Sequence, residues 1–543
     1  MHSAREGGLN IDVKVGLVSG SPLVKGYVGA DQGVGEFFSA SYKDPGAYHR
    51  QAERLDGPDG DEQRRISAEI LKDSGVDETN LRRWMDGKGV MVTAGQQPGL
   101  FGGPLYSVYK ALSAVAAARE LESALNRPVM PLFWVASEDH DWEEAGETCV
   151  LDVENEFHRI QVTPDPNDRS RPLFRVPLDQ RISRLLDRFL ALHPDTEFSG
   201  GLEATLRAAF RPERTLAEGF KSFMGSLVES LGIRFVHAHC PSLKRHTRSV
   251  LLRELDQAEE REAELGSVAR QLTSKGYPVQ VPILERGVNL FLEGPAGRER
   301  IYRDGTGSFS LRHSGTRLSR EDILARTEED PASLSPNVLL RPVVENAIFP
   351  VVATVVGPGE IGYHAQLAPV FAGHGVSPPV LVPRHSVTLV ERKVSKVMEK
   401  FDLELEELGR PFHELAENLV QDEVPPKVRR ALGSLRGHIS RDLKELSTEA
   451  KGIDPTLQGP VDAARNQAFH TIDDLERKIV QSLKRENEVA LAQVEKAQRH
   501  LFPDGKPQER VLNPAYYLSR YGPDLIRYLS ETLQSQPVVP FGR

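Results

Sequence analysis

The fold class is indicated by residues 89–141, GVMVTAGQQPGLFGGPLYSVYKALSAVAAARELESALNRPVMPLFWVASEDHD. The run GVMVTAG is short, apolar and β-branched, which is typical of a buried strand, and VMPLFWVASEDHD is a second such run that ends in polar residues. A glycine-rich loop and the stretch 105–125, which predicts a helix, lie between them. Strand, loop, helix and strand form one βαβ unit, which predicts a parallel sheet.

Three further apolar runs extend this sheet: 233–239, 350–357 and 381–391, the last expected to run from a strand into a helix. The segments between them are interpreted as insertions, one rich in Pro, Asp and Arg and one with short alternating strands. The sequence therefore predicts an α/β, Rossmann-like parallel-sheet core with connecting insertions. Its expected parts are 1–150 (core, polar and mixed with helical pieces up to residue 85), 151–200 (insertion), 201–274 (core), 275–334 (small insertion) and 335–392 (core).

The remainder of the chain has a different character. Apolar residues recur at three-four spacing on both sides of GIDPTLQGP, as in Leu432, Leu435 and Ile439, which predicts two long helices in an antiparallel coiled-coil hairpin within residues 393–505. The second helix is expected to be longer than a compact domain needs. Its apolar stripe either contacts a second copy across 425–502, giving a homodimer, or is buried inside the hairpin. Residues 506–543 are expected to dock back on the core.

The bulk properties narrow the class of protein. A chain of 543 residues exceeds one ordinary domain, and a net charge of −10 argues against a general nucleic-acid binder. No stretch approaches the ~20 apolar residues of a membrane span, and the N-terminus lacks a signal-peptide pattern. Two cysteines, Cys149 and Cys240, cannot form a disulfide framework or an all-cysteine zinc site. We expect a cytoplasmic protein without nucleic-acid or membrane partners and without a tightly bound metal.

Two segments at expected strand ends carry chemistry. In the loop 95–104, backbone N–H groups could approach an anion next to a helix N-terminus, with Tyr106 and Lys110 on one face of that helix; the alternative is a tight structural turn. The cluster 137–141, SEDHD, suits a general base, an amine-binding site or Mg²⁺. Its alternative is a solvated strand end with a helix N-cap.

Three later segments are also polar. Arg341 could hold a carboxylate through its planar guanidinium, and 357–366 again brings glycines and polar groups to a strand end. The segment 508–522 is dense in aromatic and polar side chains. Capping and packing are the alternatives for these segments. His237, His239 and Cys240 look like a zinc fragment, but strand alternation argues against it, and their role stays open.

Several stretches resemble the bacillithiol biosynthesis cysteine-adding enzyme family, in order along the chain: TAGQQPGLFGGPLYSVYKALS (93–113), PLFWVASEDHDWEE (131–144), GYPVQV (276–281), NLFLEG (289–294), SPNVLLRPVVENAIFPVVATVVGPGEIGYHAQL (335–367), PPVLVPRHSVTLVE (378–391) and LFPDGKPQERVLNPAYYLSRYG (501–522). This resemblance implies a Rossmann-like core related to class I synthetases and a coiled-coil domain that forms a homodimer. It also implies a ligase that joins L-cysteine to the amino group of glucosaminyl malate to give bacillithiol.

Amide formation from a free carboxylate in water is uphill, so we expect ATP, with Mg²⁺, to activate cysteine. The expected catalytic residues are Asp139 or His140 as the base and Lys110 as a phosphate-binding charge. The expected substrate-binding residues are Gln96, Gln97, Tyr106, Glu138, Asp141, Asn337, Arg341, Glu360, Tyr363, Gln366 and Arg384. The expected nucleotide-binding residues are Gly99, Phe101, Gly102, Gly103, Arg510, Asn513, Arg520, Tyr521 and Gly522. 

Three alternative functions remain open at this point. The 138–141 cluster could hold the metal of a hydrolase, the loop could serve a nucleotidyltransferase acting on another small molecule, or the hairpin could belong to a non-catalytic scaffold.

Overall fold

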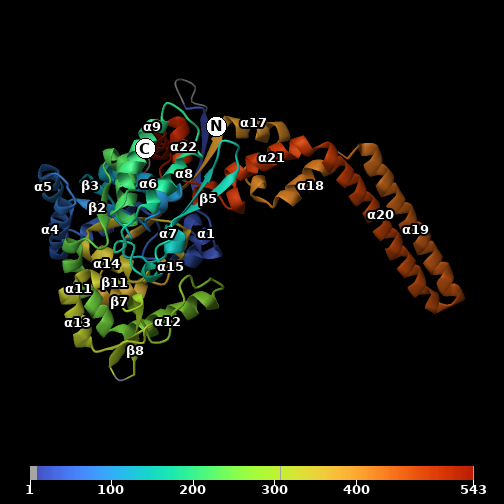
Figure 1. The fold of residues 1–543 in the computed structure, drawn as a ribbon. Helices are drawn as coiled ribbons and strands as arrows, with labels where there is room; N and C mark the ends of the chain where they lie inside the picture. The colour runs from blue at the N-terminus through green and yellow to red at the C-terminus, as the bar shows by residue number, and fades with distance from the viewer. Residues whose placement is uncertain (1–8, 306, 423, 542–543) are drawn as a thin grey trace. The chain divides into compact units, whose positions relative to one another are not determined.

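The computed structural model describes residues 9–305, 307–422 and 424–541. The chain divides into two compact units (Figure 1). One holds residues 13–388 together with the C-terminal residues from Glu509, and the other holds residues 389–508 with a short N-terminal piece.

A five-stranded parallel sheet forms the centre of the first unit, in the order β13-β12-β2-β3-β6. The strands are Val380–Pro383 (β13), Val351–Val356 (β12), Val90–Gln96 (β2), Val129–Val135 (β3) and Arg234–His237 (β6). From β2, the chain first adds β3 and β6 on one side and later adds β12 and β13 on the other. Strand order reverses there, and in open α/β sheets ligands bind at the carboxyl ends of the strands at such a point. The predicted Rossmann-like fold class is confirmed.

Helix α6 (Tyr106–Leu125) connects β2 to β3 and is buried almost all round. Alanine and leucine give it high helix propensity, and it ends where Asn126 adopts a left-handed conformation. It packs on β2, β3 and β12 on one side and on α10 (Leu216–Val228) and α23 (Asp524–Gln534) on the other. The predicted βαβ unit is therefore present.

A second, antiparallel sheet is inserted between β6 and β12, in the order β10-β9-β8-β7-β11. Its long hairpin consists of Gly287–Gly294 (β7) and Gly297–Asp304 (β8), in which Leu292 pairs with Glu299. The other strands are Ser308–Leu311 (β9), Arg317–Leu318 (β10) and Leu334–Pro336 (β11), and the helices beside it are Pro241–Asp256 (α11), Ala258–Ser274 (α12) and Arg320–Glu329 (α13). Val288, Leu290 and Leu292 alternate into a core shared with these helices.

The remaining elements cover the parallel sheet. Residues before β2 are more ordered than the expected mixture of helical pieces, because strand β1 (Ile11–Leu17) and helices α1 to α5 precede it. These helices are Pro22–Gly29, Gln32–Gly35, Pro45–Arg54, Pro58–Asp73 and Glu78–Asp86. The insertion after β3 holds α7 (Trp142–Ala145), β4 (Glu147–Leu151), β5 (Phe157–Gln161), α8 (Arg181–Leu190) and α9 (Ser199–Ala209). Helices α14 (Arg341–Ile348), α15 (Pro358–His364), α16 (Ala368–His374) and α22 (Ala515–Tyr521) complete the unit, and β1 pairs with β14 (His385–Glu391).

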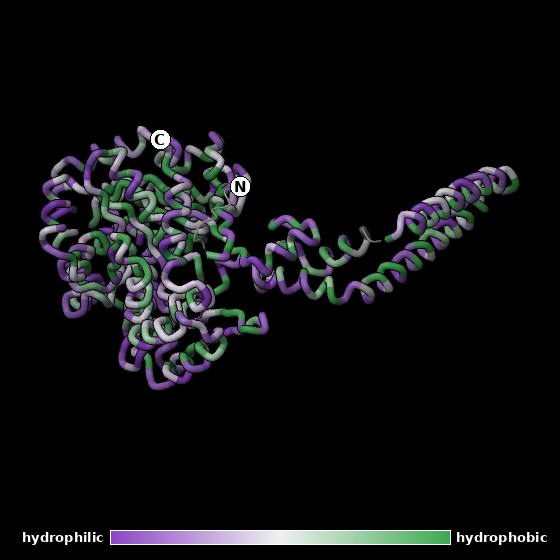
Figure 2. The backbone as a smooth tube through the Cα atoms, turned by 90° about the horizontal axis from the view of Figure 1, so that it is seen from above, coloured by the Kyte–Doolittle hydropathy of each residue, from purple (hydrophilic) through white to green (hydrophobic). Residues whose placement is uncertain are grey.

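The second unit is helical and includes α17 (Arg392–Phe401) and α18 (Phe412–Asp422). Helices α19 (Pro426–Ile453) and α20 (Gln458–Glu486) form the predicted hairpin, and Arg436 of α19 pairs with Asp473 of α20. The expected single second helix is divided, because α20 ends at Asn487 and α21 (Glu488–Leu501) follows. Apolar residues, green in Figure 2, recur along the hairpin. No helix within the described residues is long and apolar enough to cross a membrane.

Candidate active site

A cavity of about 600 Å³ lies at the carboxyl ends of the parallel strands, where the reversal of strand order predicts a ligand site. Residues 95–97 reach it from β2, 134–140 from β3, 357–360 from β12 and Arg384 from β13. The inserted sheet closes another side with Phe291, Arg298 and Arg300.

Lys110 joins the ends of β2 and β12. Its buried ammonium donates to the Gly95 carbonyl at 2.6 Å and to Gln96 Oε1 at 3.0 Å, and it pairs with Glu360 Oε2 at 2.5 Å. An ammonium has three N–H donors, so these acceptors use all of them. Lys110 borders the cavity but, contrary to expectation, has no free N–H group for a phosphate. Burial lowers its pKa, and the Glu360 carboxylate opposes that effect.

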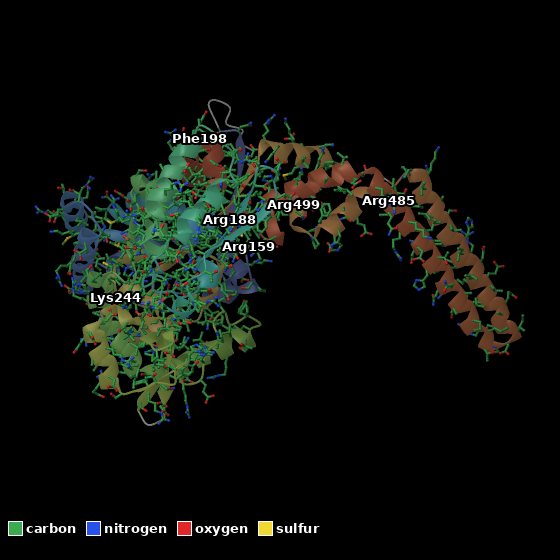
Figure 3. All side chains as sticks on the ribbon, in the orientation of Figure 1. Arg159, Arg188, Phe198, Lys244, Arg485 and Arg499 are labelled. Carbon is green, nitrogen blue, oxygen red and sulfur yellow. The ribbon has the colours of Figure 1, made fainter. Side chains whose placement is uncertain are left out.

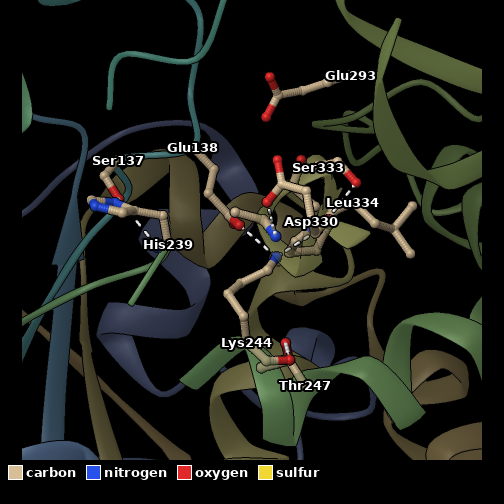
Figure 4. A network of polar contacts seen from close by, with 12 residues as sticks. Ser137, Glu138, His239, Lys244, Thr247, Glu293, Asp330, Ser333 and Leu334 are labelled. Carbon is tan, nitrogen blue, oxygen red and sulfur yellow. Dashed lines mark hydrogen bonds and ion pairs between the residues drawn. The ribbon is translucent and has the colours of Figure 1, made fainter. Parts of the chain in front are cut away.

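Glu138, at the end of β3, is held by a buried ion pair. Lys244 of α11 reaches its carboxylate at 2.6 Å and also donates to the Leu334 carbonyl of β11 (Figure 4). Both side chains are nearly inaccessible to solvent. On the other side of this strand end, the Ser137 hydroxyl lies 2.7 Å from Nδ1 of His239, whose ring stacks on Phe174. Glu138 therefore reaches the cavity from a fixed position.

Asp139 and His140 have different surroundings from those of Glu138. Asp139 accepts a hydrogen bond from the Gln97 side chain and one of 2.7 Å from the His140 N–H. Burial favours the neutral acid, but the positive charge of Arg298 and these hydrogen bonds prevail and lower the pKa of Asp139. An Arg298 N–H donates to His140 Nδ1 at 3.2 Å. Because a guanidinium can only donate, Nδ1 is the acceptor and the proton of the neutral ring is on Nε2. Burial and the Arg298 charge also lower the pKa of His140.

Two other expected cationic residues, Arg341 and Arg384, already have carboxylate partners. Arg341 donates to Glu345 at 2.6 Å and to the Tyr363 hydroxyl at 3.2 Å. Arg384 forms a two-point ion pair with Glu509 at 2.7 and 2.8 Å. Arg341 therefore lines the cavity with its charge paired to Glu345 and with N–H groups to spare, and its expected role in binding a substrate carboxylate stays a prediction.

Glu144 and Arg510 border the same cavity, and their side chains have fewer bonds to the rest of the protein than the residues above. Partial burial, followed by the nearby Asp141 and Asp139 charges, raises the pKa of Glu144. Neither side chain forms an ion pair with any residue that the structure describes, and Arg510 is exposed. Burial and the Glu144 charge raise the pKa of neighbouring Tyr106 to about 12. The raised pKa makes the Glu144 carboxylate a better proton acceptor than an ordinary glutamate.

The glycine loop itself lies behind the cavity wall. Phe101 is fully buried between Phe189 and Phe210, and a Cβ placed on Gly102 would come within 2.6 Å of the Phe223 ring. The Asn513 amide holds this turn by donating to the Phe101 and Gly103 carbonyls. Gly99, Phe101, Gly102, Gly103 and Asn513, which were expected to bind a nucleotide, do not line the cavity, and in the structure they pack and hydrogen-bond within the protein.

Other expected residues also lie away from the cavity. The Arg520 guanidinium lies over the ring of Tyr516. Gly522 packs against Phe198, which is labelled in Figure 3. Neither Tyr521 nor Gly522 lines the cavity. Asp141 is an exposed N-cap of α7. The fully buried Gln366 pairs with the backbone of Val281 through two hydrogen bonds of 2.9 Å, which fixes a cavity-lining segment from behind.

Neither metal hypothesis gains a ligand set from the geometry. Within the described ranges, no three His, Cys, Asp or Glu side chains are grouped so that they could hold a metal ion. Burial lowers the pKa of His237 to about 3, while Cys240 lies beside the Ser242 hydroxyl. The 138–141 cluster diverges, since Glu138 faces Lys244, Asp139 faces Gln97 and Asp141 caps a helix.

Comparison with known proteins agrees with this architecture. The family model described as "Bacillithiol biosynthesis BshC, N-terminal Rossmann-like domain" matches residues 10–385, and the one described as "Bacillithiol biosynthesis BshC, C-terminal coiled-coil domain" matches residues 387–537. The chain belongs to the bacillithiol biosynthesis BshC family. A relative from Salinibacter ruber, named "Putative cysteine ligase BshC", is 33% identical over 87% of this chain and 87% of its own length. A relative of the same name from Chlorobaculum tepidum is 33% identical over 82% of this chain and 80% of its own.

Of the expected residues, thirteen line the cavity: Gln96, Gln97, Tyr106, Lys110, Glu138, Asp139, His140, Asn337, Arg341, Glu360, Tyr363, Arg384 and Arg510. Asn337 does so while its side chain bonds Asn289 and two backbone N–H groups. The sequence reasoning missed Glu144, Gln280, Phe291, Arg298 and Arg300. Glu144, Gln280 and Phe291 lie within stretches that carry the family resemblance, and the two arginines lie shortly after one of them. The resemblance therefore indicated the right segments but not which of their residues line the cavity.

Proposed function

We propose that this protein is a ligase that joins the carboxyl group of L-cysteine to the amino group of glucosaminyl malate, with ATP as the source of activation. Membership of the BshC family and the names of its relatives support this assignment. The observation that carries it is the cavity at the strand ends, where the raised-pKa Glu144 lies in the same cavity as the cationic Arg298 and Arg300.

The proposed reaction has two steps. The cysteine carboxylate attacks ATP and forms either an acyl-adenylate with release of pyrophosphate or an acyl-phosphate with release of ADP. The neutral amine then attacks the acyl carbon, the amide C–N bond forms, AMP or phosphate leaves with the C–O bonding pair, and the amine gives up one proton to a base.

Glu144 is our assignment for that base. Asp139 is less suited, because its lowered pKa makes its carboxylate a weak proton acceptor. His140 is also unsuited in its present tautomer, because Nδ1 accepts from Arg298 and Nε2 carries the proton. From Nε2, His140 can donate to an oxygen of the substrate, while Lys110 positions Gln96 and Glu360.

The proposed site has room for a nucleotide contact at its open side. Arg510 is exposed and forms no hydrogen bond with a described residue, so its guanidinium is free for the phosphates of ATP. When bound, ATP supplies the phosphoryl or adenylyl group that activates cysteine. Mg²⁺ would arrive with these phosphates.

The direct test is a complete reaction with cysteine, glucosaminyl malate, ATP and Mg²⁺, followed by mass spectrometry. We expect bacillithiol to appear together with equimolar AMP or ADP, and neither when cysteine or the amine is omitted. Folded protein that forms no thiol product under these conditions would contradict the proposal, and production of ADP alone would indicate an unrelated ATPase.

We also propose that the α19–α20 hairpin forms a homodimer contact. Leu435 and Leu446 of α19 and Leu475 of α20 are 42%, 52% and 47% exposed, although long apolar side chains favour burial. Ile472 of α20 is only 4% exposed because the hairpin itself buries it. Light scattering should give a dimer for the wild type and a monomer for Leu446→Asp, with Val489→Asp, which is also exposed, as the comparison. A wild-type monomer at micromolar concentration would rule this out.

A further inference from the structure

Two arginines of the inserted sheet face the cavity together. Arg298 and Arg300 are two residues apart on β8, so their side chains emerge on the same face of the strand. Both guanidinium groups lie over the ring of Phe291 on β7, at 4.0 and 5.8 Å from its centroid. All three side chains line the cavity.

Arg298 is held firmly, and although the Asp139 charge acts on it from nearby, it forms no direct ion pair with a described residue. It is 8% exposed and donates to the Ser335 hydroxyl and the Pro336 carbonyl at 2.9 Å, and to His140 at 3.2 Å. A guanidinium has five N–H groups, so two remain after these three bonds. No carboxylate of the described chain lies within ion-pair distance of Arg298.

Arg300 repeats this arrangement. Its guanidinium donates to the Val288 carbonyl at 2.9 Å and to Asn289 Oδ1 at 3.3 Å, and both acceptors are neutral. It forms no ion pair with a described residue either. By contrast, the cations on the parallel-sheet side of the cavity each form an ion pair with a carboxylate: Lys110, Arg341 and Arg384.

Two neighbouring and largely buried cations that form no direct ion pair with a described residue are unfavourable in the empty protein. A ligand that brings negative charge removes this cost, so the geometry selects an anion. Planar guanidinium forks side by side match two carboxylates, each bound at two points. Phosphates are more often held by glycine loops and helix N-termini, and this wall is an antiparallel sheet.

We propose that Arg298 and Arg300 bind the two carboxylates of the malyl group and are the specificity-determining residues for the amine substrate. This inference rests on the proposed function. The Phe291 ring lies against both guanidinium groups and shields part of each from water, which strengthens their bonds to the carboxylates. Because Arg298 also contacts His140, the bound malyl group lies next to the Asp139–His140 cluster, within reach of the catalytic end of the cavity.

The test uses the full chain and two probes, L-malate and ATP, in titration calorimetry. We expect Arg300→Met and Arg298→Lys to weaken L-malate binding roughly tenfold to hundredfold, the range for a charge-assisted contact, with ATP affinity unchanged. Lysine keeps the charge of Arg298 and removes its fork. Arg317→Met, on the exposed β10 of the same sheet, is the matched control and should bind both probes like the wild type.

Turnover gives the second readout. In Arg300→Met the KM for glucosaminyl malate should rise by a similar factor with little change in kcat, whereas the KM for methyl glucosaminide, which lacks both carboxylates, should rise far less. Loss of ATP affinity with intact malate binding would overturn the inference in favour of a phosphate site, and unchanged affinities for both probes would also overturn it. If Arg298→Lys does not fold, Arg300→Met decides alone. Arginine-dependent malate binding without bacillithiol formation would instead refute the proposed reaction and leave the anion site standing.

Discussion

The two walls of the cavity differ in whether their cationic side chains form ion pairs. On the parallel-sheet side each cation has a carboxylate partner within the same unit: Lys110 with Glu360, Arg341 with Glu345, and Arg384 with Glu509. On the inserted-sheet side the hydrogen bonds of Arg298 and Arg300 to described residues all go to neutral acceptors, although the Asp139 charge acts on Arg298 from nearby. The paired groups hold the strand ends in place, whereas the unpaired groups keep hydrogen-bonding capacity for a ligand. Charge pairing therefore separates the residues that build the site from those that use it.

The largest effect should come from breaking a pair. Lys244→Met leaves the Glu138 carboxylate buried without a counter-ion, so we expect the free energy of unfolding to fall by about 3–5 kcal/mol. Urea denaturation followed by circular dichroism measures this change. The double variant with Glu138→Gln should recover much of the loss. A single variant as stable as the wild type would mean that the pair does not hold the strand end.

Removing Glu144, which forms no ion pair with a described residue, should lower the catalytic rate and leave the stability of the fold unchanged. Glu144→Gln removes the proposed base, and we expect kcat to fall about 10²–10⁴-fold at an unchanged melting temperature. Since the pKa of Glu144 is raised, wild-type activity should increase with pH until this carboxyl loses its proton, above the usual range of a glutamate. That limb should be absent from the pH profile of the variant. A variant that keeps both the rate and the limb would place the base elsewhere.

The smallest effect sharpens the contrast. Removing an unpaired cation also removes its desolvation cost, so Arg300→Met should change the free energy of unfolding by less than about 1 kcal/mol. Its stability is measured by the same urea denaturation as that of Lys244→Met. A loss as large as that of Lys244→Met would show that Arg300 serves the fold, and the two walls would then not differ.

Much of the fold could be predicted because its signals are local. Apolar strands on either side of a glycine loop and an alanine-rich helix identified β2, α6 and β3, and three-four spacing identified the hairpin of α19 and α20. Helical pieces before β2 were predicted without their bounds, because polar, amphipathic segments gain their order from packing on the sheet. The division at Asn487 had only a weak signal in the interrupted apolar stripe.

The site was predicted by position more successfully than by role. Strand ends located Glu138, Asp139 and Gln97 in the cavity, but no pattern shows that Lys110 uses all its donors within the protein or that Gly102 faces Phe223. These depend on contacts between segments far apart in sequence. Valine at Gly102 should destabilise the protein, because the φ of this residue is +100° and the Phe223 ring leaves no room for a side chain.

The inserted sheet posed a different difficulty. The stretch GRERIYRD (297–304) alternates charged residues as a solvated strand does, so Arg298 and Arg300 cannot be told apart from Arg303 by sequence pattern alone. In the structure Arg303 pairs with Glu262 of α12, while the other two turn into the cavity. Only the packing of β7 and β8 against the parallel sheet separates them.

The most direct test of the ligase assignment follows an isotope in the carboxylate of cysteine. The protein is incubated with ATP, glucosaminyl malate and cysteine carrying heavy oxygen in both carboxylate positions, and the products are analysed by mass spectrometry. The account predicts one heavy oxygen in the new amide and one in AMP or phosphate, in equal amounts with bacillithiol. Bacillithiol formed without transfer of heavy oxygen to AMP or phosphate would contradict activation of the carboxylate by ATP.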